Sequence, residues 1–342
     1  MRNFLVFTYP LQLVFDETSN SYRGIFHAWV YREIQNELLH RAAQKVFQRL
    51  FKVSKEDLKN TLFQKRLNQF LVDNLPNQRL FLDFKNERIP HLRLKEKTQA
   101  NGHLFSEINL AQDIFIQTKL PLHQWHSFML SPLRLYEEEE HFLGSCQFLD
   151  EDGLSIISDI DDTIRDSGVH RTRELVVRTF FEEFKPIEGM SALYKKWEQD
   201  QNAAFHYVSS MPWQFSDVVL DFFQKNEFPL GSLHFKQVRF KDRSALSLLT
   251  SPESQKIKKI QFLFENFPKR RFYLVGDTGE KDPEVYSYFL RKNAQRVERV
   301  YLRKVNCTAS RENEIKALFK WLPQEKWFLF DDPKEIPKEI KE

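Results

Sequence analysis

The chain has 342 residues, 33 of them phenylalanine, and a formal net charge of only +3. This length and apolar content are enough for two domains with well-filled cores, and the near-neutral charge gives no support to a nucleic-acid partner. The two cysteines, Cys146 and Cys307, lack metal-type or redox-type spacing, so they imply no disulfide framework and suit a reducing, cytoplasmic setting. No apolar stretch is long enough to cross a bilayer, and residues 1–15 are predicted to form a strand rather than a signal peptide.

Residues 1–150 are predicted to form a β-rich, sandwich-like domain with a helical insertion. Residues 24–31 and 79–85 have the composition of strands, and residues 91–110 predict a hairpin with Asn101 and Gly102 at its turn. Two helices are predicted between these strands. One face of the first helix is made of Ile34, Leu38, Ala42, Val46 and Leu50. The second helix is predicted to be capped by Ser54, and its apolar side carries Leu58, Leu62, Leu67 and Phe70.

Residues 151–330 are predicted to form an α/β domain with a parallel sheet flanked by helices. Short apolar segments alternate here with helical patterns, which is typical of that architecture. The predicted strands are residues 154–160, 204–209, 271–277 and 299–303. Apolar positions at helical spacing lie between them, for example Met190, Tyr194 and Trp197, and Pro283 can open a further helix. Residues 331–342 form a polar tail.

Polar residues follow three of these predicted strands at the point where each strand ends. The first strand ends in the segment from Asp159 to Thr163, which reads Asp-Ile-Asp-Asp-Thr, the second in Ser209 and Ser210, and the third in the segment from Gly276 to Asp282. Ligands of open α/β sheets bind outside the carboxyl ends of the strands. We therefore expect the three segments to converge at one edge of the sheet.

These residue types at one edge favour phosphoryl-transfer chemistry. Several carboxylates in one cleft repel each other, and Mg²⁺, which prefers oxygen ligands, relieves that repulsion. One carboxylate can then attack phosphorus, and a second carboxylate two residues later can protonate the leaving oxygen and activate water. A hydroxyl at a strand end and a lysine can hold the other phosphoryl oxygens, and Lys256 is the natural candidate for that lysine.

Each of these features has an ordinary structural explanation when taken alone. Ser209 is more often a turn residue, Lys256 a surface lysine, and an Asp-x-Asp-x-Thr pattern an acidic turn. A calcium-binding loop of the EF-hand type is excluded, because it would need glycine in place of Ile164 and glutamate in place of His170. No dinucleotide-binding, P-loop or serine-hydrolase glycine motif is present. Along the chain, a strand ending in Asp-x-Asp-x-Thr is followed by a strand ending in serine, a helix with a lysine, and a strand ending in Gly-Asp. This order of four features favours the catalytic interpretation.

Longer segments resemble the haloacid dehalogenase superfamily of phosphatases and, within it, the App1-type phosphatidate phosphatases. The matching segments include GLSIISDIDDTIRDSGV (153–169), FHYVSSMPWQF (205–215) and FPKRRFYLVGDTGEKDPEVY (267–286), and the N-terminal domain contributes chiefly NGHLF (101–105). The resemblance implies a haloacid-dehalogenase-like sheet without a large cap. It also implies that Asp159 is the nucleophile and Asp161 the acid/base.

The same resemblance implies the binding residues. The Mg²⁺ ligands are expected to be Asp159, Asp161, Asp277 and Asp282. Ser209 and Lys256 are expected to bind the phosphoryl group, and we assign Thr163 and Ser210 to the same substrate-binding set.

The resemblance implies that phosphatidic acid is hydrolysed to diacylglycerol and phosphate through an aspartyl-phosphate intermediate. Two alternatives stay open: the same mechanism acting on a phosphoprotein or a soluble phosphoester, and a non-catalytic module that binds a membrane or a protein. The short interval between Asp159 and Ser209 has no room for a full lid domain, so an open site is expected, which suits a lipid headgroup. We expect a cytoplasmic protein that can be peripheral on membranes. A basic segment made of Lys236, Arg239, Lys241 and Arg243 could meet anionic lipid, although a solvated loop is the more common explanation of such a segment.

Overall fold

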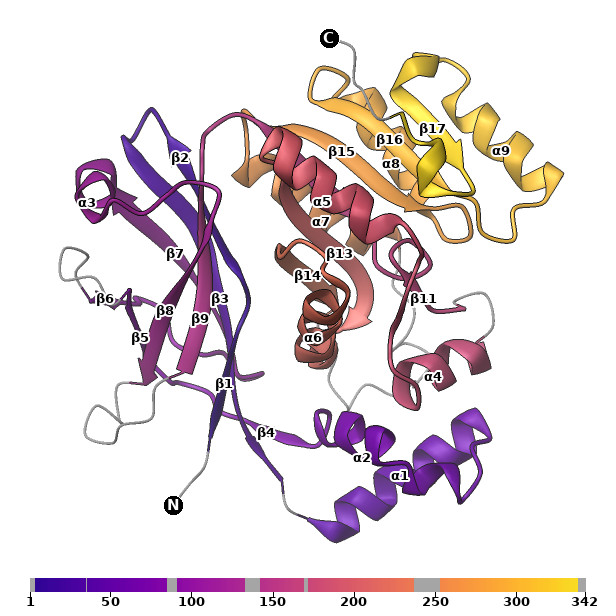
Figure 1. Ribbon diagram of the computed structural model, residues 1–342. Coiled ribbons are helices and arrows are strands. Elements are labelled where there is room, and N and C mark those ends of the chain that lie inside the picture. Colours follow the sequence, from indigo (N-terminus) through magenta and orange to yellow (C-terminus); the bar gives the residue numbers. More distant parts are fainter. Residues whose placement is uncertain are drawn as a thin grey trace. The chain divides into compact units, whose positions relative to one another are not determined.

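The computed structural model describes residues 4–34, 36–84, 91–132, 142–168, 172–236 and 253–337, and these form two compact units (Figure 1). Unit 1 comprises the described residues of 1–46 and 65–151, and unit 2 comprises those of 47–64 and 152–342. Of the predicted basic segment, Arg239, Lys241 and Arg243 lie outside the described residues. No helix among the described residues is long and apolar enough to span a bilayer.

Unit 1 is built on a single nine-stranded sheet, which is mostly antiparallel. Its main path runs β1 (Leu5–Thr8), β3 (Ser21–Glu33), β2 (Leu11–Asp16), β9 (Phe142–Leu149), β8 (Trp125–Pro132), β5 (Leu80–Asp83) and β6 (Leu92–Arg93), while β4 (Val72–Asn74) and β7 (His103–Ala111) also pair with β3. β2 and β9 are parallel. Alternate residues of the long strands meet in one core, which includes Phe26, Leu104, Phe128 and Phe148. A short helix, α3 (Gln112–Thr118), follows β7.

The predicted hairpin at residues 91–110 is wrong. β6 pairs with β5, and β7 pairs with β3 over the whole length of β7. The turn at Gly102 does form, with φ +74° and a hydrogen bond from its N–H to the Gln99 carbonyl. This turn leads into β7, and all nine residues of β7 pair with β3. Nine such pairs stabilise the sheet more than a hairpin with the two-residue strand β6 would.

The two helices predicted in the first half are α1 (Glu37–Phe51) and α2 (Thr61–Asn68). Ser54 does not cap α2. Its hydroxyl accepts the N–H of Asp57 at the start of the short 3₁₀ turn Asp57–Lys59, and Asn60 caps α2 by accepting the N–H groups of Leu62 and Phe63.

The face of α1 that carries Leu38, Ala42 and Val46 is exposed, and the opposite face is the buried one. On that buried face, Phe47 packs against the rings of Phe63 and Phe180, with centroids 5.0 and 4.7 Å away.

Unit 2 contains a six-stranded sheet in which every described pair of neighbours is parallel. The strand order is β14 (Ser232–Lys236), β13 (Ala204–Pro212), β10 (Leu154–Ser158), β15 (Arg271–Asp277), β16 (Val297–Arg303) and β17 (Trp327–Phe330). Four of these strands coincide with predicted ones, and β14 and β17 add the two edges. Strands β13 and β14 therefore follow β10 on one side, and β15, β16 and β17 follow on its other side. Such an order creates a topological switch point between β10 and β15, where ligands of open α/β sheets bind.

Helices cover both faces of this sheet, which confirms the predicted parallel sheet flanked by helices (Figure 1). One face packs against α5 (Met190–Gln201) and α6 (Ser216–Asn226), as shown by the ring contacts Tyr194–Phe205 and Phe223–Tyr207. The other face packs against α7 (Glu253–Asn266) and α8 (Asp282–Lys292) through Phe264, whose ring stacks on Phe272 and Phe289, and α9 (Ala309–Phe319) packs beside α8.

The connection from β10 to β13 is small, as the prediction of a site without a large cap requires. Its described residues form only the two-stranded pair of β11 (Arg165–Asp166) and β12 (Lys185–Pro186), helix α4 (Thr172–Phe180) and α5. At the other end of unit 2, the predicted polar tail begins with an ordered 3₁₀ turn, Pro333–Glu335, which is capped by Asp332 and followed by the buried Ile336.

His206 on β13 is fully buried in unit 2, between the hydroxyls of Ser155 and Ser232, which lie 3.1 and 2.8 Å from its ring nitrogens. Burial is the main cause that holds the pKa of this histidine well below its usual value near 6.5. The folded state therefore keeps the ring neutral, while the unfolded chain binds a proton below about pH 6.5.

The free energy of unfolding of unit 2 is expected to fall as the pH drops. The contribution of His206 is fully present above about pH 6.5 and is lost toward its lower folded pKa, by about 2 kcal/mol at about pH 5. Urea unfolding curves at both pH values measure the loss, and His206→Asn is expected to show a smaller pH dependence than the unaltered chain. An equal slope in the variant would contradict this account.

Candidate functional site

The acidic segment after β10 is held in place by its own backbone and side chains. The N–H of Asp159 donates to the carbonyl of Val275 on β15 at 2.8 Å, so this residue stays in register with the sheet and its side chain is buried. Asp162 adopts φ +54°, and one of its carboxylate oxygens accepts the N–H groups of Ser167 and Gly168. These bonds close the turn and fix the directions of the side chains at 159 and 161.

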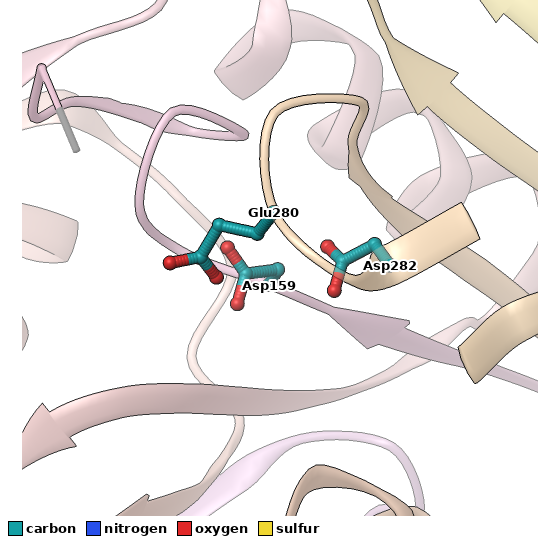
Figure 2. A group of neighbouring side chains, drawn as sticks. All are labelled: Asp159, Glu280 and Asp282. Carbon is teal, nitrogen blue, oxygen red and sulfur yellow. The ribbon is translucent and has the colours of Figure 1, made fainter. Parts of the chain in front are cut away.

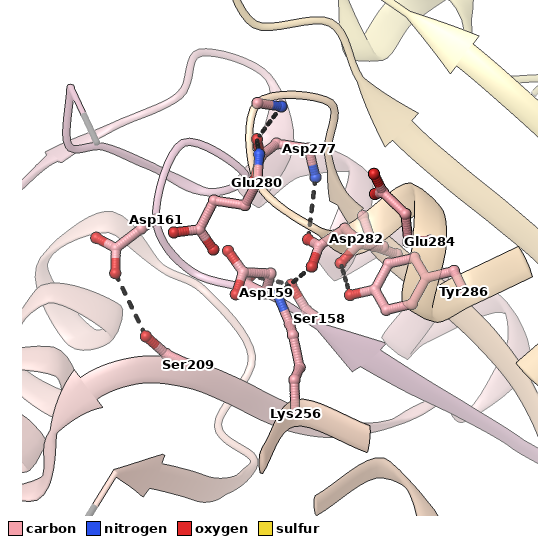
Figure 3. A network of polar contacts seen from close by, with 12 residues as sticks. Ser158, Asp159, Asp161, Ser209, Lys256, Asp277, Glu280, Asp282, Glu284 and Tyr286 are labelled. Carbon is pink, nitrogen blue, oxygen red and sulfur yellow. Dashed lines mark hydrogen bonds and ion pairs between the residues drawn. The ribbon is translucent and has the colours of Figure 1, made fainter. Parts of the chain in front are cut away.

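Lys256, in the first turn of α7, joins Asp159 to Asp282 (Figure 3). Its ammonium group is 2.8 Å from Oδ1 of Asp159 and also forms an ion pair with Oδ1 of Asp282. Lys256 is only 8% exposed, and the two carboxylates are fully buried. Asp159 directly after β10, Lys256 on α7 and Asp282 at the start of α8 therefore meet at the switch point, where the predicted segments were expected to converge.

The loop after β15 turns sharply around Asp277. One carboxylate oxygen of Asp277 accepts the N–H groups of Gly279 and Glu280 at 2.6 and 3.0 Å, and the N–H of Asp277 donates to Oδ2 of Asp282 at 3.2 Å. Gly276 is required here, because a Cβ atom at this position would lie 2.1 Å from that same Oδ2. Asp282 begins α8, where the helix dipole favours a negative charge.

Three carboxylates lie close enough to share one cation (Figure 2). Oxygens of Asp159, Glu280 and Asp282 are all within 4.8 Å of one another. Oδ2 of Asp159 and Oδ2 of Asp277 are buried without a hydrogen-bond partner in the described structure. Buried carboxylate oxygens that lack hydrogen-bond partners fit a hard divalent cation, which takes oxygen ligands.

The electrostatics of the cluster also favour a bound cation. Burial is the main cause that raises the pKa of Asp159 and of Asp277 well above the usual range, and the neighbouring carboxylates raise both further. Burial also raises the pKa of Glu280 to about 8. Lys256 opposes these shifts at all three residues, but one lysine does not neutralise this many carboxylates.

Asp161 lies apart from this cation cluster and has partners of its own. The buried guanidinium of Arg165 donates to its Oδ1 at 2.7 Å. The hydroxyl of Ser209 donates to its Oδ2 at 3.3 Å, as Figure 3 shows. Burial raises the pKa of Asp161, and Arg165 opposes that shift. A carboxyl that is oriented in this way and can keep a proton suits an acid/base role. The expectation that Asp161 also binds the cation stays a prediction.

The remaining predicted residues surround the same edge of the sheet. Ser209 accepts the N–H of Met211 at 2.9 Å, and its carbonyl accepts a hydrogen bond from Lys259 at 2.9 Å. The hydroxyl of Thr163 is buried and has no hydrogen-bond partner among the described residues. Ser210 is partly exposed.

Sequence reasoning missed four residues of this site. Glu280 is in the predicted segment, but only the fold shows that it approaches Asp159. Arg165 and Lys259 contact the predicted residues Asp161 and Ser209. Arg311 of α9 donates to the carbonyls of Thr278 and Glu280 at 3.1 Å each and so fixes the loop from outside. Arg165 and Glu280 are next to motif positions, whereas no signal in the sequence links Arg311 to this loop.

Asp277→Asn is expected to stabilise the chain in the absence of a divalent cation. The substitution removes a buried like charge and keeps the oxygen that accepts the loop N–H groups, so the free energy of unfolding in EDTA should rise by about 1 kcal/mol or more. Mg²⁺ should stabilise the unaltered chain but not this variant. Denaturation with EDTA and with Mg²⁺ measures both effects, with Asp200→Asn on the exposed side of α5 as control. Equal stabilisation of Asp277→Asn and the unaltered chain by Mg²⁺ would exclude Asp277 from the cation site.

Comparison with known proteins identifies a family for most of unit 2. Residues 154–304 match the family model of the catalytic domain of phosphatidate phosphatase APP1. Phosphatidate phosphatase APP1 of Saccharomyces cerevisiae is 27% identical over 258 residues, which are 73% of this chain and 41% of that protein. An uncharacterized protein of Schizosaccharomyces pombe is 27% identical over 169 residues, 48% of this chain and 27% of that protein. The chain thus spans less than half the length of these two relatives. The predicted resemblance to App1-type phosphatidate phosphatases is confirmed.

Solved structures resemble the chain only weakly. A ferredoxin-NADP⁺ reductase of Plasmodium falciparum covers 88% of this chain and 95% of its own at 11% identity, with a TM-score of 0.21. A β-glucuronidase of Bacteroides uniformis covers 88% of this chain and 33% of its own at 10% identity, with a TM-score of 0.25. These values are too low to assign a fold.

Proposed function

We propose that this chain, whose residues 154–304 form an App1-type catalytic domain, is a Mg²⁺-dependent phosphatase of the haloacid dehalogenase type that hydrolyses phosphatidic acid. The products are diacylglycerol and inorganic phosphate, and the reaction passes through an aspartyl-phosphate on Asp159. The similarity to phosphatidate phosphatase APP1 supports a phosphoric monoester hydrolase and a lipid substrate. We place the protein in the cytoplasm, where it would act at a membrane surface.

One observation carries the mechanism: two aspartates two residues apart have opposite environments. Asp159 forms an ion pair with Lys256 and keeps one buried oxygen without a hydrogen bond, which suits a nucleophile. Asp161 is bound to Arg165 and Ser209, outside the cation cluster, which suits a proton carrier. Such a division of environments between paired carboxyl groups is how enzymes separate nucleophilic and acid/base roles.

The first step transfers the phosphoryl group to the enzyme. Oδ of Asp159 attacks phosphorus while the bond from phosphorus to the lipid oxygen breaks, and Asp161 gives its proton to that oxygen, so diacylglycerol leaves neutral. Lys256, Ser209 and the hydroxyl of Thr163 would hold the other phosphoryl oxygens.

The second step releases phosphate. Asp161, now ionised, takes a proton from water, and the oxygen of that water attacks phosphorus and breaks its bond to Asp159. Inorganic phosphate leaves, and both aspartates return to their initial states.

The residues of the cluster fit the cation that this chemistry requires. Asp159, Glu280 and Asp282 would hold it, with the buried free oxygen of Asp277 beside them. A bound Mg²⁺ would screen the repulsion between the anionic substrate and the attacking carboxylate.

Phosphate release from phosphatidic acid in mixed micelles tests the proposal. The unaltered chain should release phosphate with Mg²⁺ and not with EDTA, and Asp159→Asn should lower the rate by about 10³-fold or more, because it removes the nucleophile. Asp200→Asn is the matched control and should keep full activity.

A small aryl phosphate separates the alternatives. Turnover of the aryl phosphate that requires Asp159, without release from phosphatidic acid, would keep the mechanism and reject the lipid in favour of another phosphoester. No turnover of either substrate would support a non-catalytic binding module.

A further inference from the structure

Helix α1 has two apolar faces, and only one of them is buried in the folded protein. Ala43, Phe47 and Phe51 are buried. Leu38, with 77% of its surface exposed, and Val46, with 48%, point elsewhere, and Ala42 between them is exposed too. These three residues are four apart and so form one row along the helix. Leu39, which is 39% exposed, widens it. We call Leu38, Leu39, Ala42 and Val46 the apolar row.

A basic row runs beside the apolar row. Arg41, Lys45 and Arg49 are also four residues apart and all exposed. Each follows a residue of the apolar row by three positions, which on a helix of 3.6 residues per turn places the two rows side by side. Glu37, which pairs with Arg41 at 3.0 Å, is the one acidic residue of α1, so the helix keeps an excess of positive charge.

An exposed apolar row needs a partner that removes it from water, and the adjacent charges select that partner. A stable protein interface takes roughly 20–30 residues on each side, far more than this narrow row offers. An anionic bilayer needs only a shallow apolar strip that enters the headgroup region and basic side chains that reach lipid phosphates or carboxylates. The two rows of α1 supply both.

We propose that α1 is an interfacial helix that binds the surface of an anionic bilayer, with the apolar row inserted and the basic row on the lipid headgroups. The inference rests on the proposed function, since a phosphatase for a membrane lipid has to reach its substrate at the bilayer surface. It adds a docking surface on a helix that carries none of the catalytic residues.

Vesicle sedimentation tests this surface without catalysis. The probe is a phosphatidylcholine vesicle with or without phosphatidylserine, an anionic lipid that carries no phosphate monoester to hydrolyse. The unaltered chain should bind vesicles that contain phosphatidylserine and not pure phosphatidylcholine, and added salt should weaken binding. The double substitution Leu38→Gln and Val46→Gln should weaken binding about fivefold or more. The exposed Leu143, which is outside α1, provides the control Leu143→Gln, which should bind normally.

The basic row is tested separately with Arg41→Gln, Lys45→Gln and Arg49→Gln combined. Each charge near an anionic surface contributes about a fivefold factor, so the loss of three charges should weaken binding by about a hundredfold. Both sets of variants should hydrolyse a soluble aryl phosphate at the unaltered rate if the chain is a phosphatase. Their vesicle binding is measured whether or not it is one, so the two proposals fail separately.

Two results would overturn the inference. The first is binding of phosphatidylserine vesicles by both α1 variants at the strength of the unaltered chain. The second is a dimer, seen by light scattering without lipid, that the apolar-row variant abolishes, because that would assign the face to a second copy of the chain.

Discussion

Buried carboxylates crowded around one lysine are the constraint on which the rest of unit 2 depends. Asp159 after β10, Asp277 at the end of β15 and Asp282 at the start of α8 are fully buried, and Lys256 forms ion pairs with Asp159 and Asp282. Burial of several like charges is costly, and a sheet keeps such a group only if the surrounding structure holds each member in place. The parallel strands do so by ending at one edge, and the order of the sheet places that edge at a switch point.

The surroundings of the cluster are shaped by the same constraint. Gly276 leaves room for the carboxylate of Asp282, and Arg311 holds two carbonyls of the loop between Asp277 and Asp282 from a helix some thirty residues further on. Arg165 orients Asp161 and is itself fixed by the hydroxyl of Thr179 at 2.9 Å and by the ring of Phe184. The predicted cation would relieve the repulsion between the buried carboxylates, which these contacts hold in place. Rigid support for a group of unfavourable charges is expected where function outweighs stability.

The sequence predicts most of unit 2 because the local signals agree there with the tertiary structure. The predicted apolar strands end at or next to Asp159, Ser209 and Asp277, and a parallel sheet brings such ends together. The edge strands β14 and β17 carry weaker patterns, and the approach of Glu280 and Arg311 depends on loop geometry that no spacing encodes. Unit 1 is harder to predict, because strand pairing there is long-range: β7 pairs with β3 and not with its neighbour in sequence. In α1 periodicity marks an apolar row, but only the structure shows that Leu38 and Val46 face away from the packed side.

The proposed mechanism requires that Asp159 becomes covalently phosphorylated during turnover. Samples quenched with acid in the steady state and then treated with borohydride would have any aspartyl-phosphate reduced to homoserine, which peptide mass spectrometry can locate. Homoserine is expected at position 159, and only when substrate and Mg²⁺ are both present. Phosphate release without modification at position 159, or modification at another aspartate, would contradict the proposed mechanism.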